Sequence, residues 1–383
     1  RTVADADETP ENRHSALHRL ADHYLHKVAV ASEIMHPDTA HRRRPIPEPA
    51  APVTGFADAA AALGWLNAER GNLLAVGVSA ADNGFPRHTI HLSELLWRYI
   101  SIGAHVDMND LYRRAVTASR LIGDRAGEAT ARLNLGVTLQ RLNLFDEAEE
   151  HLARAEGLAA ASGNVDTEAL AVVGLGRGRR RVRDFVGAEA ASRHALDLFR
   201  TKGDRYGEIT ALTHLALALG PQRRFPEAGE CLEAALALAR AIDSPNSIAD
   251  VVANSGVVLH HEGRHEQARE RLLLGLEMHR ELGRVRGAAV CLNVLGLTAT
   301  ALGDPAEAVA RHEAALECIG AAGEPLVRGH AHLGLARAHR ALGRPDPARR
   351  HAEQALALYT AIGGHEADEV RELLGALGDV ARA

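Results

Sequence analysis

The sequence has few cysteines and no cysteine motif. Its 383 residues include only Cys231, Cys291 and Cys318, which are odd in number and lack paired short spacing. This pattern argues against a disulfide framework or a zinc knuckle and favours reduced thiols, so we expect a cytoplasmic protein. No apolar run approaches the roughly 18 residues of a membrane span, so we expect no membrane association.

Lysine is also scarce. The chain has only Lys27 and Lys202, so nearly all of its basic side chains are arginines. The formal net charge is −6, which excludes a globally basic nucleic-acid binder and leaves only a local patch open. Alanine, leucine, glutamate and arginine dominate instead, and these residues favour helix over strand. The sequence begins at Arg1 with neither an initiating methionine nor a signal peptide, so we expect a piece of a longer chain.

An internal repeat with a period of 40 residues runs through most of the chain. Five of the six clear units start at a glycine, and the starts are Gly123, Gly163, Gly203, Asp243, Gly283 and Gly323. A column of small residues lies thirteen positions later, at Gly136, Gly176, Ala216, Gly256, Gly296 and Ala336. An alanine column follows at Ala148, Ala188, Ala228, Ala268, Ala308 and Ala348. Six units in a single register are not a chance pattern.

Proline and glycine divide each unit into two helices. Pro245 and Pro325 lie two residues after a unit start, where the first turn of a helix tolerates proline. Gly263 and its equivalents mark a turn in the middle of the unit. For the first clear unit we therefore predict helix A over 127–141 and helix B over 146–162. The small columns let neighbouring helices approach closely, because larger side chains there would overpack the contact.

The two ends of the array differ from its centre. Residues 83–122 form a degenerate unit that keeps the helix-B alanine, Ala115, and has Leu96 in place of the small helix-A residue. At the other end, an apolar stripe at helical spacing predicts a capping helix that packs on the last repeat. The stripe consists of Val370, Leu373, Leu374, Leu377 and Val380.

The first 80 residues do not share the repeat. Residues 13–33 predict one amphipathic helix, and the stretch from Phe56 to Val78 predicts another. Between them, five prolines and the basic run from His41 to Arg44 predict a linker or long loop.

The spacing of Leu135-Gly136, Ala148 and Ala155 resembles the tetratricopeptide pattern, with a unit of 40 residues in place of about 34. Armadillo and HEAT arrays share a period near 40 residues but lack this glycine–alanine–alanine spacing.

The region before the array carries a more specific resemblance, through the stretch from Ala21 to His26 and the stretch from Trp65 to Leu73. It is similar to the segment that joins the winged helix of an NB-ARC ATPase to its tetratricopeptide array in SARP/AfsR-like bacterial regulators of the STAND type.

This resemblance implies an all-α, right-handed superhelical array of about seven TPR-like helix pairs. It also implies a sensor or interaction arm of a transcriptional regulator, with an NB-ARC domain that binds ATP or ADP and a DNA-binding domain upstream. Because the sequence contains no GxxxxGK[ST] phosphate-binding loop, we expect no cofactor and no specific nucleic-acid binding in this chain. The expected segments are 1–54 (helix and Pro-rich linker), 55–82 (helical lead-in), the units 83–122, 123–162, 163–202, 203–242, 243–282, 283–322 and 323–362, and a capping helix over 363–383.

Two motif-like stretches have stronger structural explanations. The run from His261 to His265 has the letters of HExxH, but Gly263 lies at an expected turn, and the zinc motif needs one continuous helix. The run from Gly174 to Gly178 lacks the third glycine of a dinucleotide loop and lies inside a repeat helix, where small residues allow close packing. We therefore expect no metal site and no enzyme.

The densest basic cluster consists of Arg177, Arg179, Arg180, Arg181 and Arg183. Arg177 and Arg181 are four residues apart and share a helix face. If helix A lines a concave groove, they can hold an acidic peptide, a phosphate or an acidic domain surface without a role in folding. The alternative is a solvated helix face.

A second set lies in one helix-A column, where Asn134, His214 and Asn254 align and Asn293 is one residue off. Asparagine amides both donate and accept hydrogen bonds, which suits the backbone of an extended peptide. The alternative is that these residues cap turns or face water. The candidate partner-binding residues are Asn134, Arg177, Arg180, Arg181, His214, Asn254 and Asn293.

These observations favour a binding module whose partner is a protein, a peptide or the upstream domains of the same regulator. The runner-up is a free-standing TPR scaffold or peptide-signal receptor. The sequence does not identify the partner.

Overall fold

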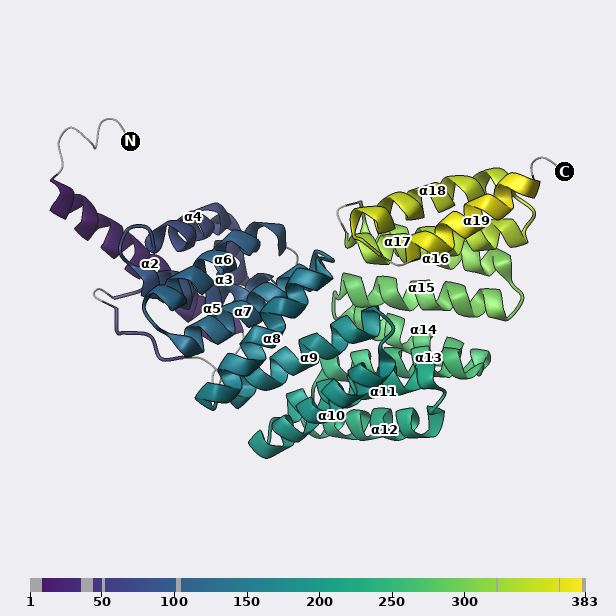
Figure 1. Ribbon diagram of the computed structural model, residues 1–383, viewed down its shortest axis with the longest axis horizontal. Coiled ribbons are helices and arrows are strands. Elements are labelled where there is room, and N and C mark those ends of the chain that lie inside the picture. Colours follow the sequence, from purple (N-terminus) through teal and green to yellow (C-terminus); the bar gives the residue numbers. More distant parts are fainter. Residues whose placement is uncertain are drawn as a thin grey trace. The chain divides into compact units, whose positions relative to one another are not determined.

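The computed structural model describes residues 9–35, 44–49, 52–100, 105–321, 323–364 and 366–380, and within these ranges its regular structure is entirely helical. The prediction of an all-α array is confirmed (Figure 1). The chain divides into two compact units, Arg1–Ala171 and Val172–Ala383, which are described separately.

The first unit contains α2 (Pro10–Met35), α3 (Ala59–Ala68), α4 (Arg70–Ala80), α5 (Pro86–Ile100), α6 (His105–Leu121), α7 (Arg125–Arg141) and α8 (Phe145–Ser162). Helix α9 (Val165–Arg181) spans the boundary. The second unit continues with α10 (Phe185–Lys202), α11 (Arg205–Leu219), the short 3-10 helix η2 (Gly220–Gln222), α12 (Phe225–Ala241), α13 (Pro245–Glu262), α14 (His265–Glu281), α15 (Val285–Ala301), α16 (Pro305–Ile319), α17 (Pro325–Ala341), α18 (Pro345–Ala361) and α19 (Glu366–Val380).

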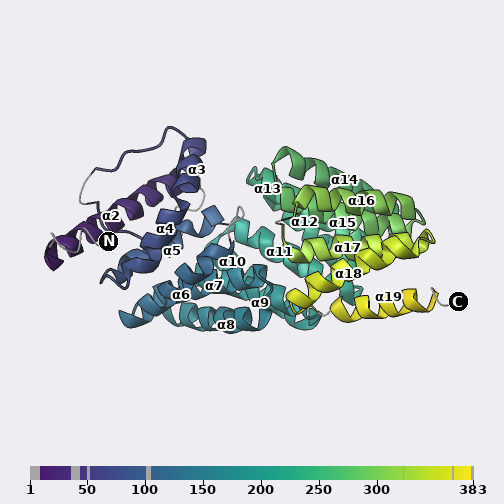
Figure 2. The same cartoon turned by 90° about the horizontal axis from the view of Figure 1, so that it is seen from above.

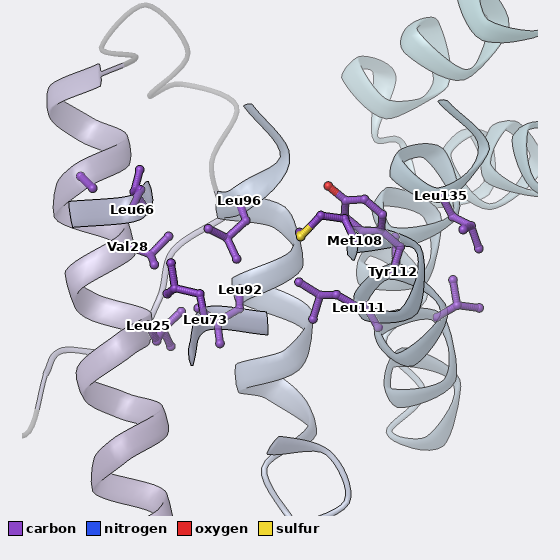
Figure 3. Close-up of a cluster of buried hydrophobic side chains, with 14 of the residues drawn as sticks. Leu25, Val28, Leu66, Leu73, Leu92, Leu96, Met108, Leu111, Tyr112 and Leu135 are labelled. Atoms are coloured by element: carbon purple, nitrogen blue, oxygen red, sulfur yellow. The ribbon is translucent and has the colours of Figure 1, made fainter. Parts of the chain in front are cut away.

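The lead-in before the repeats packs as a helical bundle around one apolar cluster. Figure 3 shows side chains of α2 facing those of α5, with Leu66 and Leu73 from α3 and α4 between them. Tyr112 of α6 lies in the same cluster and is fully buried.

One expectation for this region was wrong: the stretch 56–78 is not one helix. It forms α3 and α4, which meet at Glu69. The carboxylate of Glu69 accepts hydrogen bonds from the hydroxyl of Tyr24 at 2.7 Å and from the amide of Asn72 at 2.8 Å. The contact with Tyr24 joins residues far apart in sequence, so periodicity alone could not reveal it.

Of the expected linker, Pro37 and the run from His41 to Arg43 lie outside the described residues. Arg44 is described, and its guanidinium binds Glu94 and Asp124, each at 2.9 Å. This residue is therefore anchored to the start of the repeats.

Turn chemistry defines the helix pairs. The first clear pair, α7 and α8, begins and ends within two residues of the predicted helices. Helix α8 ends at Gly163, whose φ of 68° lies in the left-handed region that glycine adopts without a Cβ clash. The one aspartate in this column, Asp243, adopts the same region with a φ of 48°. From Gly123 to Gly283 the column is therefore a series of left-handed turns, whereas before the next unit the left-handed residue is Gly320 and not Gly323.

The small helix-A column provides space for a side chain of helix B in the same unit, as predicted. A Cβ on Gly136 would lie 2.6 Å from the Cγ of Leu152, and one on Gly256 would lie 2.6 Å from the Cγ of Leu272. Both distances are shorter than atoms tolerate, so glycine is needed at these two positions.

A second complementarity joins two of the units to the units that follow them, and the sequence analysis missed it. Phe199 ends helix B of one unit, and a Cβ on Gly207 of the following helix would lie 2.0 Å from its ring. His279 and Gly287 repeat this arrangement at 2.5 Å. The sequence contained a signal for this contact, because a large residue is followed eight positions later by a glycine both at Phe199 and at His279.

Within the second unit, each helix A also touches the helix A of the next pair, in the contacts α11–α13, α13–α15 and α15–α17. The array ends as predicted, with Val370, Leu373 and Leu377 of α19 buried against the last pair. Figures 1 and 2 show α17, α18 and α19 side by side.

Candidate partner-binding surface

Arg180 lies in the last turn of α9, and among the described residues no carboxylate is paired with its charge. Its side chain is half-buried, and its Nη1 atom is buried without a hydrogen-bond partner. Burial, followed by the positive charge of Arg286 on α15, lowers the pKa of Arg180 to about 10. The guanidinium therefore stays charged at neutral pH, in surroundings that disfavour the charge.

His214 on α11 lies beside this arginine. Burial lowers its pKa well below the ordinary value, and the charges of Arg180 and Arg177 lower the pKa further. His214 is therefore neutral at physiological pH. Because the charges of Arg180 and Arg177 act on His214, these three residues lie close together. We call these three residues and Arg286 the arginine cluster.

Arg286 was not among the predicted residues. It is exposed, and its Nε donates to both carboxylate oxygens of Glu324 at 2.9 Å. Glu324 thus balances the charge of Arg286 and not the charge of Arg180.

Arg181 has a different environment from the one predicted. Its Nη1 and Nη2 donate to the two carboxylate oxygens of Glu366 at 2.5 and 2.6 Å, and both side chains are 13% exposed. Glu366 is the first residue of α19, so the ion pair joins two helices that are 185 residues apart in sequence.

The prediction that Arg181 has no part in folding is therefore wrong. Burial alone would raise the pKa of Glu366, but the nearby imidazole of His330 and the hydrogen bonds from Arg181 outweigh burial and lower the pKa to about 2. His330 contributes through its Nε2, 3.7 Å from the same carboxylate. The carboxylate is charged and held by two basic groups from different helices.

The asparagines do not form a ladder of exposed amides. Asn134 belongs to the first unit, is 3% exposed and has a buried Nδ2 without a hydrogen-bond partner. Asn254 is half-buried, and its Nδ2 donates to the carbonyl of Asp250 in its own helix at 2.8 Å.

Asn293 has a packing role, which corrects its assignment to the groove. It is 5% exposed, and its Nδ2 donates to the carbonyl of Val327 at 3.0 Å. Its Oδ1 lies 3.1 Å from Nδ1 of His312. The amide thereby ties α15 to both α16 and α17, and none of its polar atoms faces a partner.

The two motif-like stretches behave as expected. Helix α13 ends at Glu262, Gly263 adopts a φ of 87°, and α14 begins at His265, so the helix breaks between His261 and His265. Gly176 lies inside α9, where a Cβ would come within 3.2 Å of Ala191. Among the described residues, no group of three or more His, Cys, Asp or Glu has the geometry of a metal site. In the same ranges, no helix is long and apolar enough to span a membrane.

Comparison with known sequences identifies the repeat. Tetratricopeptide repeat family models match residues 247–319 and, in a second case, residues 129–155 and 333–364. The chain is an array of TPR-like helix pairs.

Two relatives match the array and its lead-in together. The chain is 28% identical over 385 residues to the regulatory protein AfsR of Streptomyces griseus, and the match covers 99% of the chain. It is 30% identical over 381 residues to AfsR of Streptomyces coelicolor, covering 98% of the chain. The resemblance to AfsR-like regulators is confirmed. The match spans 38% of the length of each relative.

Solved structures share the fold. A Rap protein complexed with competence and sporulation factor has a TM-score of 0.56 at 12% identity, covering 83% of this chain and 97% of that one. NprR in complex with its cognate peptide NprX has a TM-score of 0.55 at 13% identity, and the match covers 83% of this chain and 99% of that one. A STAND protein with a tetratricopeptide repeat sensor from Pyrococcus horikoshii has a TM-score of 0.54 at 14% identity, and the match covers 76% of this chain and 43% of that one.

Proposed function

We propose that this chain is the partner-binding arm of an AfsR-like transcriptional regulator and that it controls ATPase and DNA-binding domains elsewhere in that regulator. The observation that carries the proposal is the match to two AfsR proteins over 98–99% of the chain, which includes the lead-in as well as the repeats. ATP or ADP would bind in the NB-ARC domain, and this chain would need no cofactor of its own.

The arginine cluster supports a binding role over a catalytic one. Arg177 and Arg180 lie on α9, and His214 lies on α11, the next helix A, so the group extends across two neighbouring pairs. A group of this kind fits an extended segment or a protein surface, whereas a small metabolite needs a mostly apolar enclosure. Repeat arrays use such continuous surfaces for partners.

A second candidate function is a peptide-signal receptor. The Rap protein and NprR were solved with peptide factors, and the alignments cover 97–99% of those chains. In this case the occupant would be a peptide and not a domain of the regulator.

Site-specific photo-crosslinking tests the proposal and separates the two candidates. A photoreactive amino acid replaces Asn254 on the half-buried helix-A side, or Leu273 on the exposed side of α14 as the control. The complete gene product is then irradiated in its native host. We expect a discrete adduct at 254 and none at 273.

Mass spectrometry of that adduct decides between the occupants, because a regulator domain and a short peptide differ in size and sequence. A transcription reporter, read with and without the array, tests control of a regulator. Equal crosslinking from both positions, together with unchanged transcription when the array is deleted, would contradict the proposed function.

A further inference from the structure

Two neighbouring arginines at the end of α9, Arg180 and Arg181, have different electrostatic environments. Arg181 is neutralised by a two-point contact with Glu366, at 2.5 and 2.6 Å. Arg180 carries a buried Nη1 without a partner. A charged group that is removed from water without a counter-charge lowers stability, so an unbalanced guanidinium at this place has a reason other than folding.

The contact with Glu366 shows what chemistry the end of α9 binds. A guanidinium and a carboxylate match as planar, two-point partners. Glu366 is delivered by α19, which lies at the far end of the second unit in sequence. A carboxylate of the chain itself thus binds one of two adjacent arginines, and among the described residues the other arginine has no carboxylate partner.

We propose that Glu366 is an internal competitor, and that an acidic segment of a polypeptide partner displaces it and binds Arg180 and Arg181 together. This inference rests on the proposed function, because it names the chemistry of the partner. The partner carboxylates would balance the charge on Arg180 and replace the bond that Arg181 makes to Glu366.

Charge matching favours carboxylates over phosphates at this site. Arg286 is balanced by Glu324 and His214 is neutral, so Arg177 is the other charged group of the arginine cluster near Arg180. One unbalanced guanidinium matches a single negative charge better than a phosphate dianion. The net charge of −6 also opposes a long polyanion such as nucleic acid.

Substitutions of Arg180 and of Glu366 should change the affinity for one acidic probe in opposite directions. The probe is a fluorescein-labelled peptide of eight glutamates, whose anisotropy is titrated with the full 383-residue chain. Arg180→Met should weaken binding by about tenfold or more, because it removes a charged hydrogen-bond donor. Glu366→Gln should strengthen binding several-fold, because it removes the competing charge from Arg181.

Matched controls lie on exposed helix-B positions of the same unit. Arg240→Met on α12 and Glu353→Gln on α18 make the same chemical changes away from the contact and should leave binding unchanged. An octaglutamine peptide should not bind, and added salt should weaken the octaglutamate complex. A phosphoserine peptide of equal length should bind no more tightly than octaglutamate.

Melting temperatures distinguish a binding role from a structural one. Arg180→Met should melt at or above the temperature of the wild type, because the variant removes an unbalanced charge. Glu366→Gln should melt lower while binding more tightly, a combination that a purely structural glutamate would not produce.

Each contrary result overturns a defined part of the inference. Unchanged binding by Arg180→Met would remove Arg180 from the site, and unchanged or weaker binding by Glu366→Gln would exclude Glu366 as a competitor. Tighter binding of the phosphoserine peptide would make the partner phosphorylated. If the wild type and Glu366→Gln both fail to bind octaglutamate, the inference fails, while crosslinking at position 254 still tests the proposed function separately.

Discussion

His312 illustrates how single residues set the packing of the array. In two other units the equivalent helix-B residue is a leucine that packs against a helix-A glycine, Leu152 against Gly136 and Leu272 against Gly256. His312 packs between two glycines, because a Cβ on Gly296 would lie 2.4 Å from its ring and one on Gly334 would lie 2.2 Å away. The imidazole therefore fills a space made by two neighbouring helices.

We expect Gly334→Ala to lower the free energy of unfolding by about 1–3 kcal/mol, because the new methyl group would overlap the buried ring of His312. Urea unfolding measures the loss. Gly375→Ala on α19 is the control, since its Cβ would meet no atom within 4 Å and alanine favours helix. In a His312→Ala background the cost of Gly334→Ala should nearly disappear, and a cost that stays the same in both backgrounds would refute the overlap.

The same histidine makes stability depend on pH. The amide nitrogen of Asn293 donates to Val327, so its oxygen faces His312 and accepts the Nδ1 proton, which leaves Nε2 bare. Nε2 is buried without a partner, so protonation there is costly. Burial, followed by the charges of Arg337 and His330, lowers the pKa of His312 to about 4.

The sign of the pH effect follows from this depressed pKa. Between the ordinary pKa of about 6.5 and the folded value of about 4, the unfolded chain binds a proton that the folded chain does not. Stability should fall as pH drops through this range, by on the order of 3 kcal/mol for this group alone. His312→Leu should give a flatter curve of melting temperature against pH, and a curve parallel to that of the wild type would contradict the assignment.

At the scale of elements, the Arg181–Glu366 pair holds the first turn of α19. Glu366→Gln should destabilise the docking of α19 by about 1–3 kcal/mol, because it weakens a partly buried, charge-assisted contact. Hydrogen exchange of the α19 amides should become faster, whereas Glu353→Gln should not change it. Unaltered exchange in α19 would show that the apolar stripe alone holds the helix.

Acid should weaken this contact in a window lower than the histidine window. The folded pKa of Glu366 is about 2 and the ordinary value is 4.5, so its contribution is present above pH 4.5 and is lost as the pH falls toward 2. The wild type and Glu366→Gln should therefore converge in α19 exchange at the acid end of this range.

The helix pairs could be predicted from sequence because their determinants are local and repeated. Gly163 sets a left-handed turn, Pro245 starts a helix, and Gly136 faces a residue of its own unit. The break at Glu69 could not be predicted in this way, since it involves Tyr24 from another helix.

The candidate site was predictable only in part, for a related reason. Arg177, Arg180 and His214 follow from the helix-A register within neighbouring units. The partner of Arg181 depends on how helix pairs accumulate rotation along the second unit until α19 meets α9. A 40-residue period fixes the contents of each pair and leaves this rotation unspecified.

At the scale of the whole chain, charge determines the last expectation, which concerns DNA. The formal charge is −6, and the described surface arginines include several that are paired with carboxylates, such as Arg224 with Glu189 and Arg286 with Glu324. An arginine that is paired with a carboxylate attracts phosphate only weakly, because its charge is already balanced. We therefore expect the chain alone to bind no DNA sequence specifically.

Mobility-shift titrations at two salt concentrations measure this expectation. At low salt, the arginine cluster can attract DNA weakly, and Arg180→Met should reduce that binding. The affinity should fall steeply as salt rises to the physiological range, because binding driven by phosphate contacts depends on counterion release. Arg240→Met is the control for the loss of one exposed charge. A shift that persists at physiological salt and discriminates between promoter and scrambled DNA would instead place sequence recognition within the array itself.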